Sequence, residues 1–452
     1  NIQLFTQDFE NTRTVRLEQN YRSTGNILQA ANAVITHNFG RLGKELWTAG
    51  DQGDPITLYA GFNEQDEARF IVERIEQWVN GGELRQDAAI LYRSNAQSRV
   101  LEEALIRAGM PYRIYGGQRF YERLEIRNAL SYMRLMVGRG NDAAVERVIN
   151  TPPRGIGGKT VDKLREVARE RDLSLWNSIA IVQEEKLLPA RALTALEGFC
   201  VCINELDSAT DELGLDELID HVIEQAGLIE MHKKEKGERG QARVENLEEL
   251  VTAGKQFETV DDDLSPLQEF LDNAALDAGD AQADEHEDSV QLMTLHSAKG
   301  LEFPLVFLAG VEENLFPHRM SLEEPGRLEE ERRLCYVGIT RAMKQLIITY
   351  AETRRMHGNE SFNAPSRFIR EIPSELLEEV RLHTTISRPV SFATHEIPET
   401  DISLGQRVYH QVFGEGVVLN FEGRGASARV EVNFDMEGSK WLVLQYANLQ
   451  LM

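Results

Sequence analysis

Hydrophobic residues in the first hundred positions alternate between two periods. Residues 24–37, 64–79 and 97–108 place apolar side chains three and four positions apart, which predicts amphipathic helices. Short apolar runs at residues 56–60 and 88–92 predict strands between those helices. Strands that alternate with helices are typical of a parallel sheet covered by helices, so we predict an α/β domain here.

The pattern changes after Gly116-Gly117. Residues 125–275 have helical spacing almost throughout, with breaks at Thr151-Pro152-Pro153 and at residues 233–240. The α/β pattern then returns, with strands predicted at residues 290–295, 305–308 and 346–351 and a helix at residues 328–340. We therefore predict one sheet domain into which an all-helical domain is inserted.

The last part of the chain has a third pattern. Residues 386–402 contain two prolines and no periodicity, which is typical of a linker. Short strands separated by glycine turns follow, at residues 407–409, 416–419, 428–434 and 441–443. They predict a small five-stranded barrel.

Composition and charge exclude some classes of protein. Hydrophobic residues make up 42% of the 452, yet no run of about 18 apolar residues occurs, so no membrane span is expected. No secretory leader opens the chain, and the three cysteines are too few for a disulfide framework, which favours the cytoplasm. No cysteines and histidines have zinc spacing, so no metal site is predicted.

The net charge of 49 − 74 = −25 would by itself count against a nucleic-acid binder. However, residues 258–288 hold twelve Asp and Glu and no Lys or Arg. About half of the excess therefore lies in one solvated stretch, and local basic stripes remain elsewhere.

Three stretches carry candidate chemistry. Each places an arginine or a polar cluster near the end of a predicted strand or at the start of a helix, where an α/β sheet presents groups to an anion. Arginine suits phosphate because it is always charged and binds bidentately. Single arginines carry little information, so surface or ion-paired roles for Arg22 and Arg341 stay open from spacing alone. The stretches are residues 17–23 (LEQNYRS), 294–303 (TLHSAKGLEF) and 329–342 (EEERRLCYVGITRA).

Residues 155–160 (GIGGKT) imitate a phosphate loop. The first glycine of that motif would fall on Pro153, and a helix is predicted before it where the motif needs a strand. A turn between helices fits better, with Gly155, Ile156 and Gly157 exposing backbone N–H groups at a helix N-terminus. Such groups bind a duplex phosphate without reading sequence. A plain connecting turn is the alternative.

Together with residues 91–99 (LYRSNAQSR) and 115–122 (YGGQRFYE), the three stretches resemble motifs of UvrD-type superfamily 1 DNA helicases. The resemblance runs in order along essentially the whole chain. It implies an α/β fold: a RecA-like parallel-sheet domain, an inserted all-helical domain and a C-terminal Tudor- or SH3-like β-barrel. The implied segments are 1–17 (end of a first RecA-like domain), 18–115 and 289–385 (second RecA-like domain), 116–288 (helical domain), 386–403 (linker) and 404–452 (barrel).

The resemblance also implies roles for individual residues. Arg22 and Arg341 would reach the γ-phosphate of ATP, with Arg341 as the arginine finger, and Glu302 would hold the ribose. Arg93, Asn95 and His296 would lie along single-stranded DNA, and Gly155, Ile156 and Gly157 would contact the duplex. Phe120 and Tyr115 would offer bases a stacking face, although a core role for Phe120 stays equally open. A hairpin at residues 356–361 would carry His357 at its tip against the terminal base pair; a solvated turn histidine is the alternative.

The sequence departs from the family pattern in one respect. It contains no G-x-x-x-x-G-K-[ST] and no acidic Walker B strand. We therefore expect a C-terminal portion that works with an absent N-terminal half, which would supply the P-loop and the Mg²⁺ ligands.

The function expected is that of an ATP-dependent 3′→5′ DNA helicase in nucleotide excision and mismatch repair. It would act on single strands and single-strand/duplex junctions. The barrel would recruit RNA polymerase or repair proteins. The alternative is a non-enzymatic DNA- and protein-binding adaptor without a motor, which would not need Arg341 or Glu302.

Overall fold

The structure is a computed structural model, and its chain divides into two compact units, residues 1–382 and 383–452. The residues that it describes are 9, 15–39, 45–208, 210, 213–235, 237–260, 264–279, 287–324, 326–356, 359–380, 406–411, 413–422, 429–434, 438–443, 447 and 449–451.

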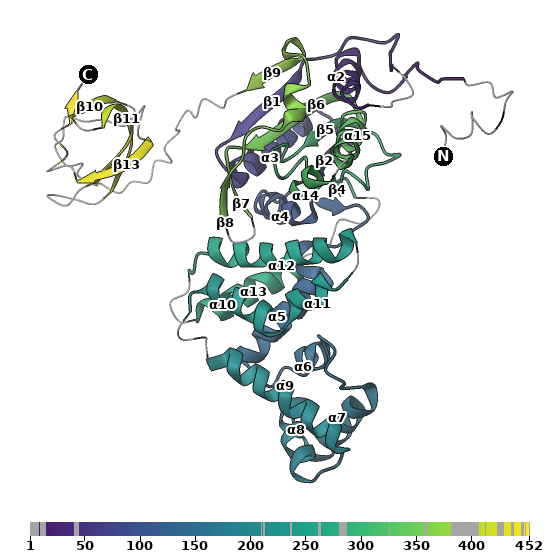
Figure 1. The fold of residues 1–452 in the computed structure, drawn as a ribbon, viewed down its shortest axis with the longest axis vertical. Helices are drawn as coiled ribbons and strands as arrows, with labels where there is room; N and C mark the ends of the chain where they lie inside the picture. Colours follow the sequence, from purple (N-terminus) through teal and green to yellow (C-terminus); the bar gives the residue numbers. More distant parts are fainter. Residues whose placement is uncertain are drawn as a thin grey trace. The chain divides into compact units, whose positions relative to one another are not determined.

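A seven-stranded sheet organises the first unit, in the order β3-β4-β2-β5-β6-β1-β9, and all its neighbouring strands are parallel. Strands from before and after the helical region interleave in it, so the two α/β segments of the sequence build one sheet (Figure 1). The strands are β1 (Ile56–Gly61), β2 (Ala88–Tyr92), β3 (Tyr112–Ile114), β4 (Val290–Thr294), β5 (Phe303–Leu308), β6 (Ala342–Ala351) and β9 (Leu377–Val380). The pattern did not predict β3 and β9, which are short strands at the two edges.

Helices cover both faces of this sheet. Along β2, Ala89 and Leu91 face one core and Ile90 and Tyr92 face the other, which is why this strand is apolar throughout. On the first face lie α2 (Gly25–Thr36) and α15 (Arg327–Ile339), and on the second α3 (Glu64–Asn80) and α4 (Ser98–Arg107). Short helices and 3₁₀ turns lie in the connections of the sheet domain. They are α14 (Arg319–Glu323), α16 (Arg367–Arg370), η1 (Arg85–Asp87), η2 (Asn95–Gln97), η3 (Phe120–Glu122) and η4 (Ser374–Leu376).

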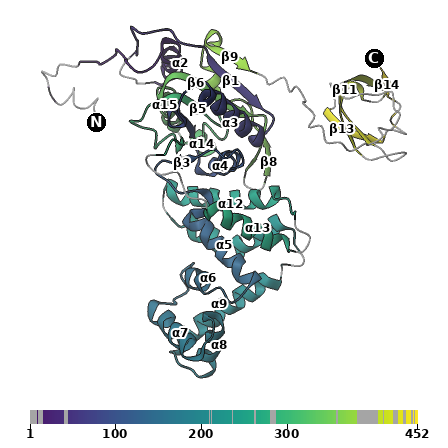
Figure 2. The same ribbon diagram turned by 180° about the vertical axis from the view of Figure 1, so that it is seen from behind.

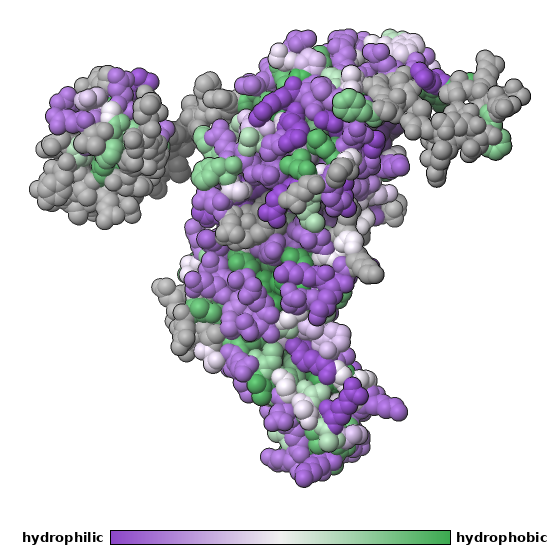
Figure 3. Space-filling view, viewed as in Figure 1, coloured by the Kyte–Doolittle hydropathy of each residue, from purple (hydrophilic) through white to green (hydrophobic). Residues whose placement is uncertain are grey.

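The helical insertion has its own apolar core, which runs from Phe120 to Ala274. Both views show α12 as the layer of the insertion that is closest to the sheet (Figures 1 and 2). The helices of the insertion are α5 (Leu124–Val137), α6 (Asp142–Val148), α7 (Gly158–Arg171), α8 (Leu175–Glu184), α9 (Ala190–Ser208), α10 (Leu215–Gln225), α11 (Leu228–Lys233), α12 (Glu238–Gln256) and α13 (Pro266–Gly279). Polar side chains cover most of the face drawn in Figure 3, with apolar residues scattered among them.

A β-hairpin leaves the sheet domain after β6, as predicted. Strand β7 (Thr353–Met356) pairs antiparallel with β8 (Asn359–Phe362), in the register Met356↔Asn359. The tip residue His357 lies outside the described residues, so its role as a wedge stays a prediction. The predicted linker at residues 386–403 lies outside them as well.

The second unit is a five-stranded antiparallel sheet in the order β13-β12-β11-β10-β14. Valines 408, 418, 430 and 432 and Phe434 form its core. The strands are β10 (Arg407–His410), β11 (Gly414–Glu422), β12 (Arg429–Phe434), β13 (Gly438–Val443) and β14 (Gln450–Leu451).

In the described part of both units, no helix combines the length and the apolar character that crossing a membrane requires.

Candidate nucleotide wall and nucleic-acid interface

Arg22, Glu302 and Arg341 meet at one edge of the sheet. Arg22 lies in the turn before α2, Glu302 directly precedes β5, and Arg341 joins α15 to β6. Strands β5 and β6 are parallel neighbours, and the backbone N–H of Phe303 donates to the carbonyl oxygen of Arg341 at 3.0 Å. The sheet register therefore brings together three residues that the sequence places in separate motifs.

The two arginines of this cluster share a single carboxylate. The Nε of Arg22 donates to Glu302, and its Nη1 lies 3.4 Å from the carbonyl oxygen of Thr340. Arg341 donates only to neutral oxygens, including the carbonyl of Leu301 at 2.8 Å. Burial lowers the pKa of Arg341, and the positive charge of Arg22 lowers it further. The cluster thus has an excess of positive charge, which an anion would relieve.

The motif around Arg22 supplies its own support. The Oδ1 of Asn20 accepts the backbone N–H groups of Arg22 at 2.8 Å and Ser23 at 2.9 Å. The Ser23 hydroxyl donates to the carbonyl oxygen of Ala342 at 2.7 Å. Asn20 and Ser23 therefore hold Arg22 next to the segment that carries Arg341, a role the sequence did not assign to them.

A cavity of about 600 Å³ gathers the residues predicted to face a single strand. Arg93, Asn95 and His296 all line it, from the ends of β2 and β4. Helix α14 of the sheet domain and helices α11 and α12 of the insertion complete the lining, so the cavity lies between the sheet domain and the helical insertion. The carboxyl ends of parallel strands are where open α/β sheets bind ligands.

Arg93 forms an ion pair within the protein that the sequence did not predict. Its Nε lies 3.0 Å and its Nη2 2.7 Å from carboxylate oxygens of Glu331, which is on α15. Burial opposes the charge of Glu331, but the bonds from Arg93 lower its pKa. Because α15 ends at Ile339, two residues before Arg341, this ion pair connects the cavity to the helix that leads into the cluster of Arg22, Glu302 and Arg341.

Glu245 closes the cavity from the side of α12, and sequence reasoning missed it. Its carboxylate accepts from the Ser94 hydroxyl at 2.8 Å and lies 3.3 Å from the Nε2 of His318. Burial opposes its ionisation, yet the hydrogen bonds from His318 and Ser94 hold the pKa of Glu245 at about 2. One signal could have found it: Glu245, Glu249, Thr252 and Gln256 form a polar stripe at helical spacing along residues 238–256, and the first three of them are buried in the structure.

That stripe docks the helical insertion on the sheet domain. Arg99 on α4 is buried, and its Nε lies 2.8 Å from Glu249, which is also buried. The Nη2 of Arg99 donates to Gln256 at 2.7 Å, and Gln256 donates to Glu64 at 2.7 Å.

We expect Glu245→Gln to lower the free energy of unfolding at pH 7 and to flatten its acid dependence. The folded pKa of about 2 lies below the value of about 4.3 in an unfolded chain. The stabilising contribution is therefore complete above the unfolded pKa and is lost as the pH falls toward 2. Urea denaturation between pH 7 and pH 2 measures it, with the exposed Glu197→Gln as the control. Parallel pH profiles for both variants would contradict the assignment.

The two aromatic residues proposed to stack on bases differ in exposure. Phe120 is 1% exposed and packs edge-to-face against Tyr121 in the core of the insertion. Because its ring is buried, it offers no face to a base. The structure therefore supports the core role of Phe120 and not stacking on a base. Tyr115, by contrast, is 44% exposed.

The turn that imitates a phosphate loop follows the short segment after α6, so a helix precedes it, as predicted. Gly155 has φ +82°, a conformation that favours glycine, and α7 starts at Gly158 with Gly157 as its N-cap. Ile156 is buried in the core, while the glycines on both sides of it are exposed. The turn is thus pinned by one apolar side chain and presents its backbone at the surface.

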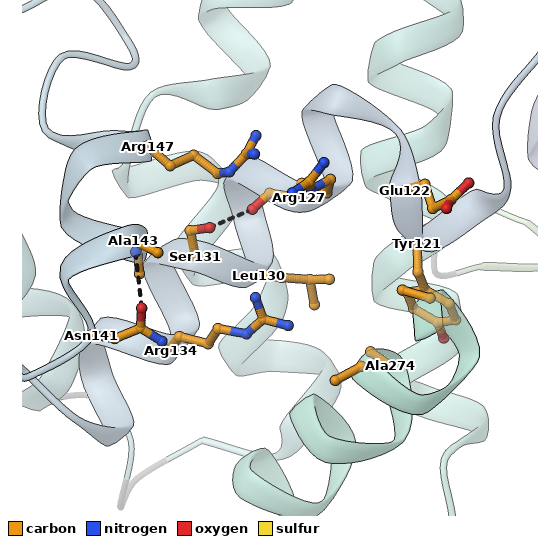
Figure 4. A pocket seen from close by; sticks show the side chains of 13 residues that line it. Tyr121, Glu122, Arg127, Leu130, Ser131, Arg134, Asn141, Ala143, Arg147 and Ala274 are labelled. Carbon is orange, nitrogen blue, oxygen red and sulfur yellow. Dashed lines mark hydrogen bonds between the residues drawn. The ribbon is translucent and has the colours of Figure 1, made fainter. Parts of the chain in front are cut away.

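Three arginines line a second cavity in the insertion, of about 400 Å³ (Figure 4). Arg127 and Arg134 come from α5 and Arg147 from α6, against one carboxylate in the lining, Glu122. Burial lowers the pKa of Arg147, and its two arginine neighbours lower it further. Within the part of the chain that the structure describes, no carboxylate forms a salt bridge with any of the three. Sequence reasoning did not single them out, although Arg127 and Arg134 are two helical turns apart on one face.

No group of three His, Cys, Asp or Glu side chains in the described residues is placed to hold a metal ion. Glu302 is engaged by Arg22, so this wall offers Mg²⁺ no carboxylate cluster of its own.

The fold and these clusters define a RecA-like α/β domain of the helicase type, with a pair of arginines next to the amino ends of two central strands. Residues 15–353 match the model of the UvrD-like helicase C-terminal domain, and residues 404–450 match that of the PcrA/UvrD tudor domain. The chain belongs to the UvrD-like helicase family.

The chain is 58% identical over 456 residues to DNA helicase II of Escherichia coli (strain K12), covering 100% of this chain and 63% of that protein. It is 52% identical over 458 residues to DNA helicase II of Haemophilus influenzae, covering 100% of this chain and 63% of that protein. It is 40% identical over 474 residues to the ATP-dependent DNA helicase PcrA of Bacillus subtilis (strain 168), covering 100% and 64%. The chain thus spans less than two thirds of the length of these relatives.

Proposed function

We propose that this chain forms part of an ATP-dependent 3′→5′ DNA helicase that acts in DNA repair in the cytoplasm. The observation that carries the proposal is the convergence of Arg22, Glu302 and Arg341 at the amino ends of β5 and β6. An adaptor without a motor would have no use for two arginines held together against their mutual repulsion.

The arginine pair would act on ATP. Arg341, which is positioned by carbonyl oxygens and forms no salt bridge among the described residues, would stabilise the charge that develops on the transferred phosphoryl group. Arg22 would bind the γ-phosphate, and Glu302 would accept from the ribose. The phosphate loop and the Mg²⁺ ligands would come from a segment of the full-length protein that corresponds to the part of DNA helicase II outside the matched 63%.

The single strand would cross the cavity that Arg93, Asn95 and His296 line. The ion pair of Arg93 with Glu331 supports coupling, because a strand phosphate near Arg93 would compete with a carboxylate on α15, the helix that leads to Arg341. Tyr115 would offer an exposed aromatic face to a base. His357 would stand at the hairpin tip.

The duplex would lie against the helical insertion. Residues 155–157 present backbone at the surface, and the cluster of Arg127, Arg134 and Arg147 provides positive charge on an acidic protein. Both features suit phosphates and read no sequence. The binding should weaken steeply as salt rises.

We expect Gly157→Ala and Gly155→Ala to weaken binding to a single-strand/duplex junction more than to single-stranded DNA. A Cβ added at either glycine meets no neighbouring protein atom within 4 Å, so at Gly157 it would obstruct only a ligand, whereas at Gly155, with φ +82°, alanine would also strain the turn. Gly157, with φ −88°, accepts alanine without strain and is the cleaner probe. Fluorescence anisotropy measures both affinities. Gly138→Ala, also in open space, serves as the control. Equal losses on both substrates would contradict the duplex role.

Strand displacement tests the proposed function directly. With ATP, the full-length protein should displace a strand from a duplex with a 3′ single-stranded tail and not from one with a 5′ tail. Binding of both substrates without ATP-dependent displacement would favour the adaptor instead.

The second unit would recruit a protein, with RNA polymerase or a repair protein as the candidate partner. The match to the PcrA/UvrD tudor domain supports this role. Co-purification of full-length protein with and without residues 404–452 tests it.

A further inference from the structure

The side chain of Asn150 shapes the turn that leads into α7. Its Oδ1 accepts the backbone N–H of Arg154 at 2.8 Å and that of Ile156 at 3.1 Å. Asn150 lies at the surface just after α6, whereas Ile156 is buried in the core of the insertion. The two bonds therefore fix the path of the chain between a core anchor and the exposed glycines.

Other contacts hold the approach to the turn from beneath. The Tyr132 hydroxyl donates to the carbonyl oxygen of Thr151 at 2.6 Å. The guanidinium of Arg154 donates to the carbonyl oxygens of Val148 at 3.2 Å and Pro152 at 3.3 Å, and stands 5.7 Å from the centre of the Tyr132 ring. These contacts secure residues 148–154, while the bonds of Asn150 carry the constraint forward to Ile156.

The groups at the far side of the turn depend on that constraint. Gly157 is the N-cap of α7 and has no side chain to satisfy the first N–H groups of the helix. The N–H groups of a first helical turn have no partner within the helix. Their direction is set by how the chain enters α7, and glycine supplies no stiffness of its own.

We propose that Asn150 is a positioning residue for duplex binding: it aims the backbone N–H groups of residues 157–159 at one phosphate of the duplex. The inference rests on the proposed function of this turn. It assigns the positioning to the acceptor oxygen of Asn150, not to a contact of its amide with DNA. A hydrogen bond to phosphate weakens steeply when its donor turns away, so a loose turn binds less tightly.

The test compares Asn150→Ala with Asn150→Asp in the full-length protein, by anisotropy with a junction and with single-stranded DNA. Alanine removes the acceptor, and we expect roughly tenfold weaker junction binding with single-strand binding unchanged. Aspartate keeps the acceptor oxygen but adds a negative charge near the phosphate. The loss of junction affinity in Asn150→Asp, relative to the parent, should therefore shrink toward none as salt rises, because salt screens the charge. The deficit of alanine should persist at every salt concentration.

Three outcomes would overturn the inference. Parental junction binding by Asn150→Ala would show that the acceptor is dispensable. An aspartate variant as weak as alanine at all salt concentrations would show that the amide itself contacts DNA. Equal losses on junction and single strand, with a lowered unfolding temperature, would show a purely structural role. Gly157→Ala, measured in parallel, separates the role of Asn150 from the role of the turn. If both Gly157→Ala and Asn150→Ala bind the junction normally, the turn does not bind the duplex and the proposed function of the turn fails. If Gly157→Ala binds the junction weakly and Asn150→Ala binds it normally, only the role of Asn150 is refuted.

Discussion

Arg341→Ala in the full-length protein is expected to lower DNA-stimulated ATP hydrolysis by ~10³-fold or more while nucleotide binding is largely kept. The physical reason is the position of its charge. The guanidinium donates to the carbonyl oxygens of Leu301 and Val337, and among the described residues it forms no salt bridge, although the charge of nearby Glu302 acts on it. Such a charge stabilises the transition state more than the ground state, and its loss therefore affects turnover more than affinity.

Steady-state hydrolysis and equilibrium binding of a nucleotide analogue together test this role. Arg333→Ala is the matched control, because Arg333 lies exposed on α15, the helix that precedes Arg341, and pairs with Glu329 and Glu330. Arg341→Lys should recover only part of the activity, since lysine lacks the planar fork. Unchanged turnover would refute the role, and parallel loss of binding and turnover would make Arg341 a binding residue instead.

Arg354→Ala is expected to destabilise the first unit by about 3–5 kcal/mol. Arg354 is buried on β7 between Glu67 of α3 and Glu312, which are also buried. Burial alone would lower the pKa of Arg354, but the two carboxylates raise it well above its ordinary value. Its removal would leave two buried carboxylates without a cation.

Urea denaturation of the 452-residue chain measures this loss, with Arg355→Ala as the control on the exposed neighbour. A difference below about 0.5 kcal/mol between the two variants would mean that water or a rearranged side chain replaces the guanidinium. Because β7 begins the hairpin, the same variant should also lose strand displacement if the hairpin separates strands.

The elements of this fold were predictable because their signal is local. Apolar residues three and four positions apart mark a helix, and apolar residues two positions apart mark a strand, so each signal lies within one element. These periods predicted the helices and most strands of the sheet, as well as the interruption of the sheet domain by the insertion. The short edge strands β3 and β9 were missed because three or four residues carry too little of either period. The motif around Arg341 and the exclusion of residues 155–160 as a phosphate loop also needed only neighbouring residues.

The sites required the tertiary structure, because their partners are distant in the chain. Arg22 and Glu302 meet across 280 positions and Arg354 and Glu67 across 287, and no periodicity relates them. The burial of Phe120 was likewise open, since an aromatic residue after a loop suits a base or a core equally. By itself the sequence determined the helical regions, most of the strands and which residues carry charge. Only the packing of the sheet and of α12 decided which charges meet, which are buried and which remain for a phosphate, because those outcomes depend on contacts that no local pattern encodes.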